Sequence, residues 1–561
     1  MPPIRLRSAL ASLACLALAA CDRGPANADR TAPRFVAAPT FAPSADPSAP
    51  LGGTIVAETD EPTRLELTVV ERDSDERRTH VIARELATKH SALALHFAAG
   101  LKHTLSVTAI DAAGNRTRAE QELTFDAPPV SEKFPPLKLT VSDLERMEPG
   151  ITLLNARGSG PPAVPPSDAF LIMVDERGRV IWYFQSSRDI VSARRLRNGN
   201  LLYVCGRKTA VEIDMLGRTV QTWFASRLGV EDKPEGATLV DLDTLHHEIY
   251  ELPSGFGADF VALSTELREV DGWPGEEWRQ GARERTAKVA GDIVVEFNRD
   301  GTVVRRFPLL DLLDPRRVDH DSLEDFWSAT YTPKDGPKGA SGELLLLDTE
   351  DWAHANAVLI DRRDSNYVVS CRNQDVLLKL DRATGKVRWL CGSPVGWREP
   401  WNDLVLTPKG RPFEWNYHQH TPRFTRDGNL IVFDNGNGRA IPPFVELRDP
   451  VRYSRAVEFK IDEQARTVEQ VWSYGSSSQP WYSFFLGGVE PLPKTGNVLV
   501  TDGGKQISPT IRQGFARVFE VTHTAAPEIV FELVIRDDAP FDALSWSVYR
   551  SERLPSVYPP E

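Results

Sequence analysis

Short runs of alternating apolar and polar residues recur in the same order from about residue 137 onward. Each copy contains an apolar alternating strand, a turn, and a second strand that ends near an aromatic residue. The six copies begin at Phe170, Val211, Val295, Leu377, Val457 and Val518. Alternation over four to eight residues is typical of half-buried β-strands. Recurrence of one hairpin indicates a repeat architecture.

Later copies carry another strand pair ahead of this hairpin, in several cases with a clear Asn-Gly or Gly-Asn turn, as around Gly199 and Gly428. Such turns between apolar alternations are strong hairpin signals. Four strands per unit, repeated six times, predict a six-bladed β-propeller over residues 137–561. Two long insertions, Glu269–Lys288 and Leu309–Asp351, are expected to be loops on one face, where propellers usually carry function.

The chain ahead of the repeats shows two other compositions. Residues 51–128 contain alternating segments such as Leu65–Val70 and Thr104–Ala109, which predict a small N-terminal β-sandwich. Residues 21–50 are rich in Ala, Pro and Ser and are expected to form a disordered tether. The predicted fold class is therefore all-β, with a sandwich followed by a propeller.

The first residues have the features of a secretion signal. A basic start with Arg5 and Arg7 precedes an apolar stretch, Ala9–Ala20, that is too short to be a permanent membrane span. The stretch ends in Leu-Ala-Ala-Cys21, which resembles the bacterial lipobox and implies removal of residues 1–20 and lipidation of Cys21. We expect a periplasmic lipoprotein anchored to a bacterial membrane. An ordinary secretory signal is the alternative, and the choice between inner and outer membrane stays open.

Charge and cysteine content narrow the function classes. The net charge of −13 argues against nucleic acid as the main partner, because phosphate contacts need a basic surface. It does not exclude an anionic small molecule, since a few local cations can reverse the field inside a cleft. Outside the signal and Cys21, the cysteines are Cys205, Cys371 and Cys391. Cys371 and Cys391 could form a disulfide or stay as buried thiols.

Histidines recur at one position of the repeat. His247 lies eight residues before the turn glycine Gly255, and His420 lies eight residues before Gly428. The copy between them places His354 at the equivalent point, the start of the innermost strand. In a propeller these positions should converge near the central channel. A single histidine at a strand start is usually structural, but three in register favour a shared site.

Other residues near these positions are weaker candidates. His246 could exchange roles with His247 if the register is shifted by one residue. His418, two residues before His420, could face the same side. Trp352 could stack on an aromatic substrate or simply pack a loop. Arg372 ends the strand that returns toward His354, so it should add a guanidinium to the same cavity, and a cationic pocket suits a sulfate or phosphate ester.

The pattern of His354-Ala-Asn356, Arg372 eighteen residues after His354, and Gln-His420 resembles the arylsulfate sulfotransferase family. The resemblance implies a periplasmic β-sandwich and six-bladed propeller. It also implies transfer of a sulfuryl group from a phenolic sulfate ester to an acceptor phenol without a nucleotide or other cofactor.

The resemblance further implies a ping-pong mechanism through a sulfohistidine. By motif, His420 corresponds to the transiently sulfated nucleophile, and His354 and Arg372 to the groups that hold the sulfuryl oxygens. Asn356 corresponds to a supporting residue and His247 to an additional active-site histidine. Donor, acceptor and oligomeric state are not identified by the sequence.

Two other functions fit the residues less well. Three histidines around one volume could bind zinc and form a metal-dependent hydrolase. The guanidinium of Arg372 disfavours this alternative because it would repel a dication. A propeller that binds an extracellular ligand without catalysis is the second alternative.

Overall fold

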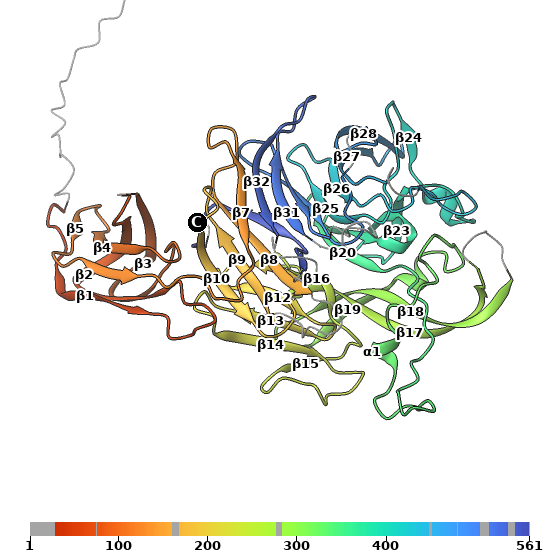
Figure 1. Cartoon of the computed structure of the whole chain (residues 1–561), viewed down its shortest axis with the longest axis horizontal. Helices are drawn as coiled ribbons and strands as arrows, with labels where there is room; N and C mark the ends of the chain where they lie inside the picture. Colours follow the sequence, from red (N-terminus) through yellow and green to blue (C-terminus); the bar gives the residue numbers. More distant parts are fainter. Residues whose placement is uncertain are drawn as a thin grey trace, which may run out of the picture.

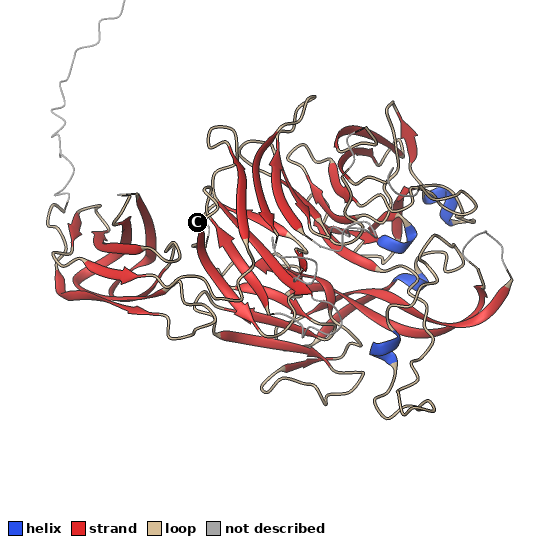
Figure 2. Ribbon diagram, in the orientation of Figure 1, coloured by secondary structure: helices blue, strands red, loops and turns tan. Residues whose placement is uncertain are grey.

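The computed structural model describes residues 29–559 apart from 75, 160–167, 277–282, 448–451, 479–480, 505–514 and 537–544. The predicted signal peptide and Cys21 lie outside the described residues. The described chain folds almost entirely into strands (Figure 2). In this part of the chain no helix combines the length and the apolar character that a membrane span requires.

The N-terminal domain is one hydrogen-bonded sheet built around the long strand β2. Strand β3 pairs with one edge of β2, and β1 and β4 pair with different halves of the other edge. Alternate residues of β2 are buried, as the sequence pattern predicts. The strands are β1 (Phe35–Pro43), β2 (Gly53–Glu71), β3 (Arg77–Ala94), β4 (Lys102–Asp111), β5 (Arg116–Arg118) and β6 (Leu123–Asp126).

Strand β1 corrects one prediction. The segment 21–50 was expected to be a disordered tether, yet Phe35–Pro43 pairs with β2. Most residues of the strand stay exposed, and it lies at a sheet edge, where backbone pairing needs few buried side chains. Phe41 contributes an aromatic contact with Phe97 and Phe125.

Six further sheets of four or five strands follow in the described residues, and they establish the predicted propeller fold. Counted outward from the innermost strand, the third and fourth strands of each sheet coincide with one of the six hairpins that the sequence predicts. The first sheet contains β8 (Ile151–Ser159), β9 (Ala169–Val174), β10 (Val180–Ser186), β33 (Ser545–Ser547) and β34 (Ser551–Leu554). The second contains β11 (Ser192–Arg195), β12 (Leu201–Cys205), β13 (Thr209–Ile213), β14 (Thr219–Ala225) and β15 (Thr238–Val240). The third contains β16 (His246–Glu251), β17 (Phe260–Pro274), β18 (Glu284–Phe297) and β19 (Val303–Pro308).

The remaining three sheets complete the ring. The fourth contains β20 (Ala355–Asp361), β21 (Asn366–Cys371), β22 (Val376–Leu380) and β23 (Val387–Gly392). The fifth contains β24 (Thr407–Lys409), β25 (His420–Phe424), β26 (Leu430–Asp434), β27 (Arg455–Asp462) and β28 (Thr467–Tyr474). The sixth contains β29 (Gly488–Pro491), β30 (Val498–Asp502), β31 (Ala516–Val521), β32 (Ile529–Ile535) and β7 (Leu137–Ser142).

The two ends of the propeller exchange strands. Strand β7, from the start of this region, pairs with β32 and completes the sixth sheet. Strands β33 and β34, from its end, pair with β8 and form the inner edge of the first sheet. Figure 1 shows orange β7 beside blue β32, although nearly the whole propeller separates them in sequence. These pairings connect the last sheet to the first.

The two insertions differ from one another. Glu269–Lys288 was expected to be a loop, but Glu269 pairs with Lys288 in an extension of β17 and β18. The prediction is wrong here because both sides of the insertion continue the alternation of their strands. Leu309–Asp351 is mainly loop, with the 3₁₀ helix η1 (Leu309–Asp311) and the single helical turn α1 (Ser328–Tyr331). The other short helices are η2 (Arg372–Gln374) and η3 (Trp401–Leu404).

The cysteines of the propeller are free and buried. Cys371 ends β21 and Cys391 lies on β23, and β22 separates these two strands. Two strand spacings amount to about 9–10 Å, which exceeds the reach of a disulfide. The structure therefore favours the second alternative, buried thiols.

Candidate active site

A cavity of about 710 Å³ opens where the inner strands of the propeller begin. His247, His354, His420 and Arg372 all line it, so the structure brings together the four residues on which the sequence prediction depends. Val191, which occupies the equivalent position of the second sheet, lines it as well. The insertion Leu309–Asp351 covers one side.

A common backbone distortion places these histidines. The pairing register shifts at the start of β16, β20 and β25. Close to each shift a non-glycine residue has a left-handed backbone, with φ of 52° at His247, 44° at His354 and 51° at Thr421. Bulges of this kind re-aim side chains next to active sites, and left-handed non-glycine residues are strained. The three inner strands therefore share a bulge with a left-handed residue, and this bulge directs an imidazole into the channel.

His420 is oriented by a neighbour that the sequence analysis missed. Its Nδ1 lies 2.7 Å from Oδ1 of Asn435 and 3.2 Å from the carbonyl oxygen of His418. The amide nitrogen of Asn435 donates to the carbonyl oxygens of Ser483 and Leu486, so its Oδ1 must face His420 as an acceptor. His420 therefore carries its proton on Nδ1, and Nε2 keeps a lone pair.

The surroundings of His420 favour the neutral ring. Burial, together with the nearby Arg372 guanidinium, holds the pKa of His420 well below its ordinary value. A neutral imidazole with a bare nitrogen is a nucleophile at neutral pH. The predicted position of the nucleophile thus has the matching electrostatics.

His354 is held by a carboxylate. Its Nδ1 forms a short contact with Oδ2 of Asp351, whose Oδ1 accepts a hydrogen bond of 2.9 Å from the Trp327 indole nitrogen. The His354 ring lies 5.0 Å from the ring of His247 and 4.8 Å from that of Phe326. Asp351 and Phe326 come from the insertion, so sequence reasoning about the repeats alone could not find them.

Arg372 returns to the face of His354, as expected from antiparallel pairing. Its backbone N–H donates to the carbonyl oxygen of His354 at 3.2 Å. The guanidinium donates to Oδ1 of Asn373 at 2.6 Å and lies 3.6 Å from the carboxylate of Asp321. It is largely buried and supplies a fixed positive charge to the cavity.

The sequence left open whether His246 or His247 faces the site, and in the structure both line the cavity. Their Nδ1 atoms lie 2.7 Å apart. His246 is buried and His247 is partly exposed. Burial and the neighbouring imidazoles of His354 and His246 lower the pKa of His247 well below its ordinary value.

Asn356 supports the site from outside the cavity. It is fully buried, and its amide nitrogen donates to the carbonyl oxygen of Gln419 at 2.8 Å. This bond connects the start of β20 to the residue before His420.

Two weaker predictions of substrate contact are wrong. Trp352 is fully buried in the core between the third and fourth sheets, and its indole nitrogen donates to the carbonyl oxygen of Arg317. His418 is buried and does not line the cavity; its two ring nitrogens each lie 3.0 Å from a carboxylate oxygen, of Asp321 and of Asp375. Burial opposes its charge, but these carboxylates outweigh burial and raise the pKa of His418 to about 10.

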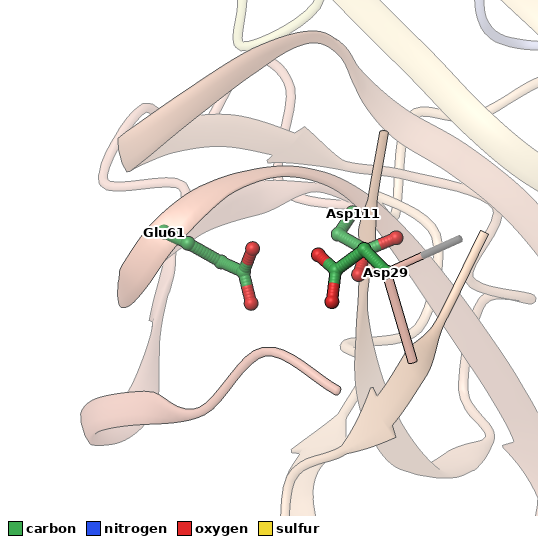
Figure 3. Close-up of side chains that lie close together, drawn as sticks. All are labelled: Asp29, Glu61 and Asp111. Atoms are coloured by element: carbon green, nitrogen blue, oxygen red, sulfur yellow. The ribbon is translucent and has the colours of Figure 1, made fainter. Parts of the chain in front are cut away.

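Possible metal ligands in the described residues lie elsewhere. Two groups of three carboxylates have ligand atoms within 4.8 Å of one another, and the cavity histidines belong to neither. One group, Asp361, Asp364 and Glu463, already binds the ammonium of Lys379. Figure 3 shows the other, in the N-terminal domain, where Asp111 is engaged by Asn115. Neither arrangement favours the three-histidine metal alternative.

Comparisons with known proteins identify the family of the chain. The sequence model of the Arylsulfotransferase (ASST) family matches residues 138–549. The arylsulfate sulfotransferase AssT of Escherichia coli O6:H1 is 28% identical over 359 residues, which cover 56% of this chain and 54% of that protein. AssT of Lelliottia amnigena is 31% identical over 224 residues, or 35% of this chain and 36% of that protein. The chain thus spans about half or less of the length of these curated relatives.

Among solved structures, a Bacteroides caccae protein of unknown function aligns with 72% of this chain and 99% of its own, at a TM-score of 0.34 and 9% identity. The periplasmic gluconolactonase PpgL of Pseudomonas aeruginosa aligns with 71% of this chain and 100% of its own, at a TM-score of 0.29 and 11% identity. The family match covers most of the propeller, including each of the cavity residues described above, and ends before β34. The chain therefore belongs to the arylsulfotransferase family.

Proposed function

We propose that this protein moves a sulfuryl group from an aryl sulfate to an acceptor phenol through a covalent intermediate on His420. The observation that carries the proposal is the orientation of His420. Asn435 fixes the proton on Nδ1, so the bare Nε2 is available in a cavity that also holds the Arg372 cation. A ping-pong cycle follows, in which the donor phenol leaves before the acceptor phenol enters.

The neighbouring groups fit the needs of this transfer. Sulfuryl transfer resembles phosphoryl transfer, where a loose transition state makes positioning and charge stabilisation dominant. Arg372 and His354 hold the sulfuryl oxygens, and His247 faces the phenolic oxygen. Loss of one such donor typically removes about 2.7–4 kcal/mol of transition-state stabilisation.

Aromatic side chains supply walls for a flat substrate. Phe326 is 39% exposed and lies at the cavity with the Arg207 guanidinium 4.1 Å from its ring centre. Phe484 and Phe485 line the cavity from the loop before β29. These apolar surfaces suit the aryl groups of donor and acceptor.

Mass spectrometry after exposure to 4-nitrophenyl sulfate tests the proposal. We expect an added sulfuryl group on the peptide that contains His420, and none in His420→Ala. His523→Ala is the matched control, because His523 is bound to Glu458 outside the cavity. Full activity in His420→Ala would refute the assignment.

We also propose that the protein is attached to a bacterial membrane on the periplasmic side through lipidated Cys21. The lipobox-like Leu-Ala-Ala-Cys21 supports this proposal. Metabolic labelling with a radioactive fatty acid should label the unmodified chain and not Cys21→Ala. Equal labelling of both would contradict the proposed anchor.

A further inference from the structure

Behind His247 lies a line of buried groups that the proposed transfer does not yet use. His246 Nδ1 faces His247 Nδ1 at 2.7 Å, and His246 Nε2 faces Oδ1 of Asp292 at 3.5 Å. Neither His246 Nε2 nor this Asp292 oxygen has another hydrogen-bond partner among the described residues. Asp292 is fully buried on β18. Buried polar atoms without partners are rare and call for an explanation.

We propose that Asp292, His246 and His247 form a proton relay that stores the phenolic proton between the two half-reactions. This inference rests on the proposed sulfuryl transfer and adds the acid–base step to it. His247 is the group that touches the phenolic oxygen, and His246 and Asp292 act through it.

The proton balance of the reaction requires such a store. In the first half-reaction the sulfur–oxygen bond of the donor breaks, a sulfur–nitrogen bond forms at His420 Nε2, and the electron pair stays on the phenolate oxygen. A phenolate whose phenol has an ordinary pKa of about 10 needs a proton in order to leave. In the second half-reaction the acceptor phenol releases one proton. The enzyme therefore lends one proton and later recovers it.

The relay has two arrangements, one that gives a proton to the leaving phenolate and one that takes a proton from the acceptor phenol. In the resting chain the Asp292 carboxyl donates to His246 Nε2, His246 Nδ1–H donates to His247 Nδ1, and His247 Nε2–H faces the phenolate as an acid. After the transfer each proton has moved by one position, so Asp292 is a carboxylate and His247 Nε2 is bare. His247 is then a base for the acceptor phenol. Both imidazoles stay neutral throughout.

The electrostatic surroundings support the resting arrangement. Burial, together with the nearby Asp351 carboxylate, raises the pKa of Asp292 well above its ordinary value, which favours the neutral carboxyl. Burial lowers the pKa of His246 to about 3, so this ring is neutral. The other Asp292 oxygen accepts from the backbone N–H of Ala355 at 2.9 Å, which anchors the carboxyl directly behind His354.

Comparison of two donors tests the relay. Phenyl sulfate releases a basic phenolate that needs the proton, whereas 4-nitrophenyl sulfate releases a weakly basic one that leaves without it. In Asp292→Asn the amide keeps a hydrogen bond to His246 but cannot release a proton. We expect single-turnover phenol release to fall at least about 30-fold with phenyl sulfate and less than about threefold with 4-nitrophenyl sulfate. A purely structural loss would lower both rates by the same factor.

Two further measurements keep the test decisive. His246→Gln breaks the relay in the middle and should give the same selective loss. Glu212→Gln is the control, because Glu212 is a buried carboxylate of the second sheet that binds Asn198 and Asn200. It should leave the ratio of the two rates unchanged. The unmodified chain should show a solvent deuterium isotope effect on single-turnover release from phenyl sulfate and none from 4-nitrophenyl sulfate.

The outcomes separate the two proposals. The relay is refuted, while sulfuryl transfer stands, if both relay variants show the same ratio of the two release rates as the unmodified chain. The same holds if the isotope effect is absent with phenyl sulfate. If the unmodified chain releases no phenol from either donor, the proposed function itself fails. If neither variant folds, the isotope effect alone decides.

Discussion

At the scale of single residues, the cavity depends on neighbours that fix the imidazoles. Asn435 leaves His420 one tautomer, because both hydrogens of its amide nitrogen are already donated to backbone carbonyls. Asp351 binds the Nδ1 of His354 in the same way. In both cases the histidine keeps a defined free nitrogen, which a flexible ring would not offer.

Replacement of Asn435 by alanine should slow sulfation of His420. The Nδ1 proton loses its acceptor, so the ring can adopt the wrong tautomer. Loss of one hydrogen bond costs about 0.5–1.5 kcal/mol, which corresponds to a rate lower by roughly two- to tenfold. Single-turnover release of 4-nitrophenol measures the effect. The control is Asn429→Ala at the far end of β26, where the amide binds Glu458. An Asn435→Ala chain as fast as this control would contradict the orienting role.

The rate of sulfation should persist below the pH at which an ordinary histidine becomes charged. Burial and Arg372 lower the pKa of His420 below 6.5, so the neutral nucleophile is present above that lowered value and is lost only as the pH falls through it. The acid limb of the single-turnover pH profile should therefore lie below pH 6.5. In Arg372→Gln the limb should move to higher pH, because a cation that disfavours the imidazolium is gone. A limb at or above 6.5 in the unmodified chain would contradict this interpretation.

At the scale of elements, the local pattern predicted the hairpins well and their partners poorly. The alternation around Val211 or Val518 identifies a strand, since burial of one face requires it. Nothing near Leu137 or Ser551 indicates that these residues pair with strands far away in sequence. The same limit applies to the site. His247, His354 and His420 share a position in the repeat. Asn435, Asp351 and Asp292 come from other segments and contact His420, His354 and His246 only in the folded chain.

The C-terminal inner strands are connected to the third sheet by a buried ion pair. Arg550, between β33 and β34, pairs with Glu248 of β16 and donates to the carbonyl oxygen of Asn356 at 3.0 Å. Arg194 lies 3.3 Å from the same carboxylate. These contacts join the C-terminal segment to the second, third and fourth sheets.

Arg550→Ala should destabilise the propeller by about 3–5 kcal/mol, because removal of one partner leaves part of a buried charge without compensation. The shift in a urea unfolding curve measures this loss. The control is Arg218→Ala, which breaks an exposed pair with Asp214 and should cost less than about 1 kcal/mol. Equal shifts in the two variants would show that the Arg550 pair adds no stability.

At the scale of the whole molecule, the cavity forms only when the ring of sheets closes. The histidines lie on the third, fourth and fifth sheets, while Tyr549 lines the same cavity from the C-terminal segment beside the first sheet. The cavity therefore needs the sheets to be held in a ring. The pairing of β7 with β32, and of β33 and β34 with β8, provides that connection.

Deletion of residues 545–561 should prevent formation of a stable propeller. Strand β8 would keep an unpaired inner edge, and such edges associate with other chains. Size-exclusion chromatography should show aggregates in place of the species formed by the unmodified chain. Addition of a peptide of residues 545–559 should restore part of the soluble form, which separates loss of the strand from general damage. A soluble deletion variant with unchanged thermal unfolding would contradict the role of closure.

The strand exchange also sets the timing of assembly. Domains usually fold as units while the chain is being synthesised, but β8 is made long before its partners β33 and β34. Its inner edge has no partner until β33 and β34 have been synthesised. During that long interval a chaperone has an open strand edge to protect, and the cavity lacks the wall that Tyr549 supplies.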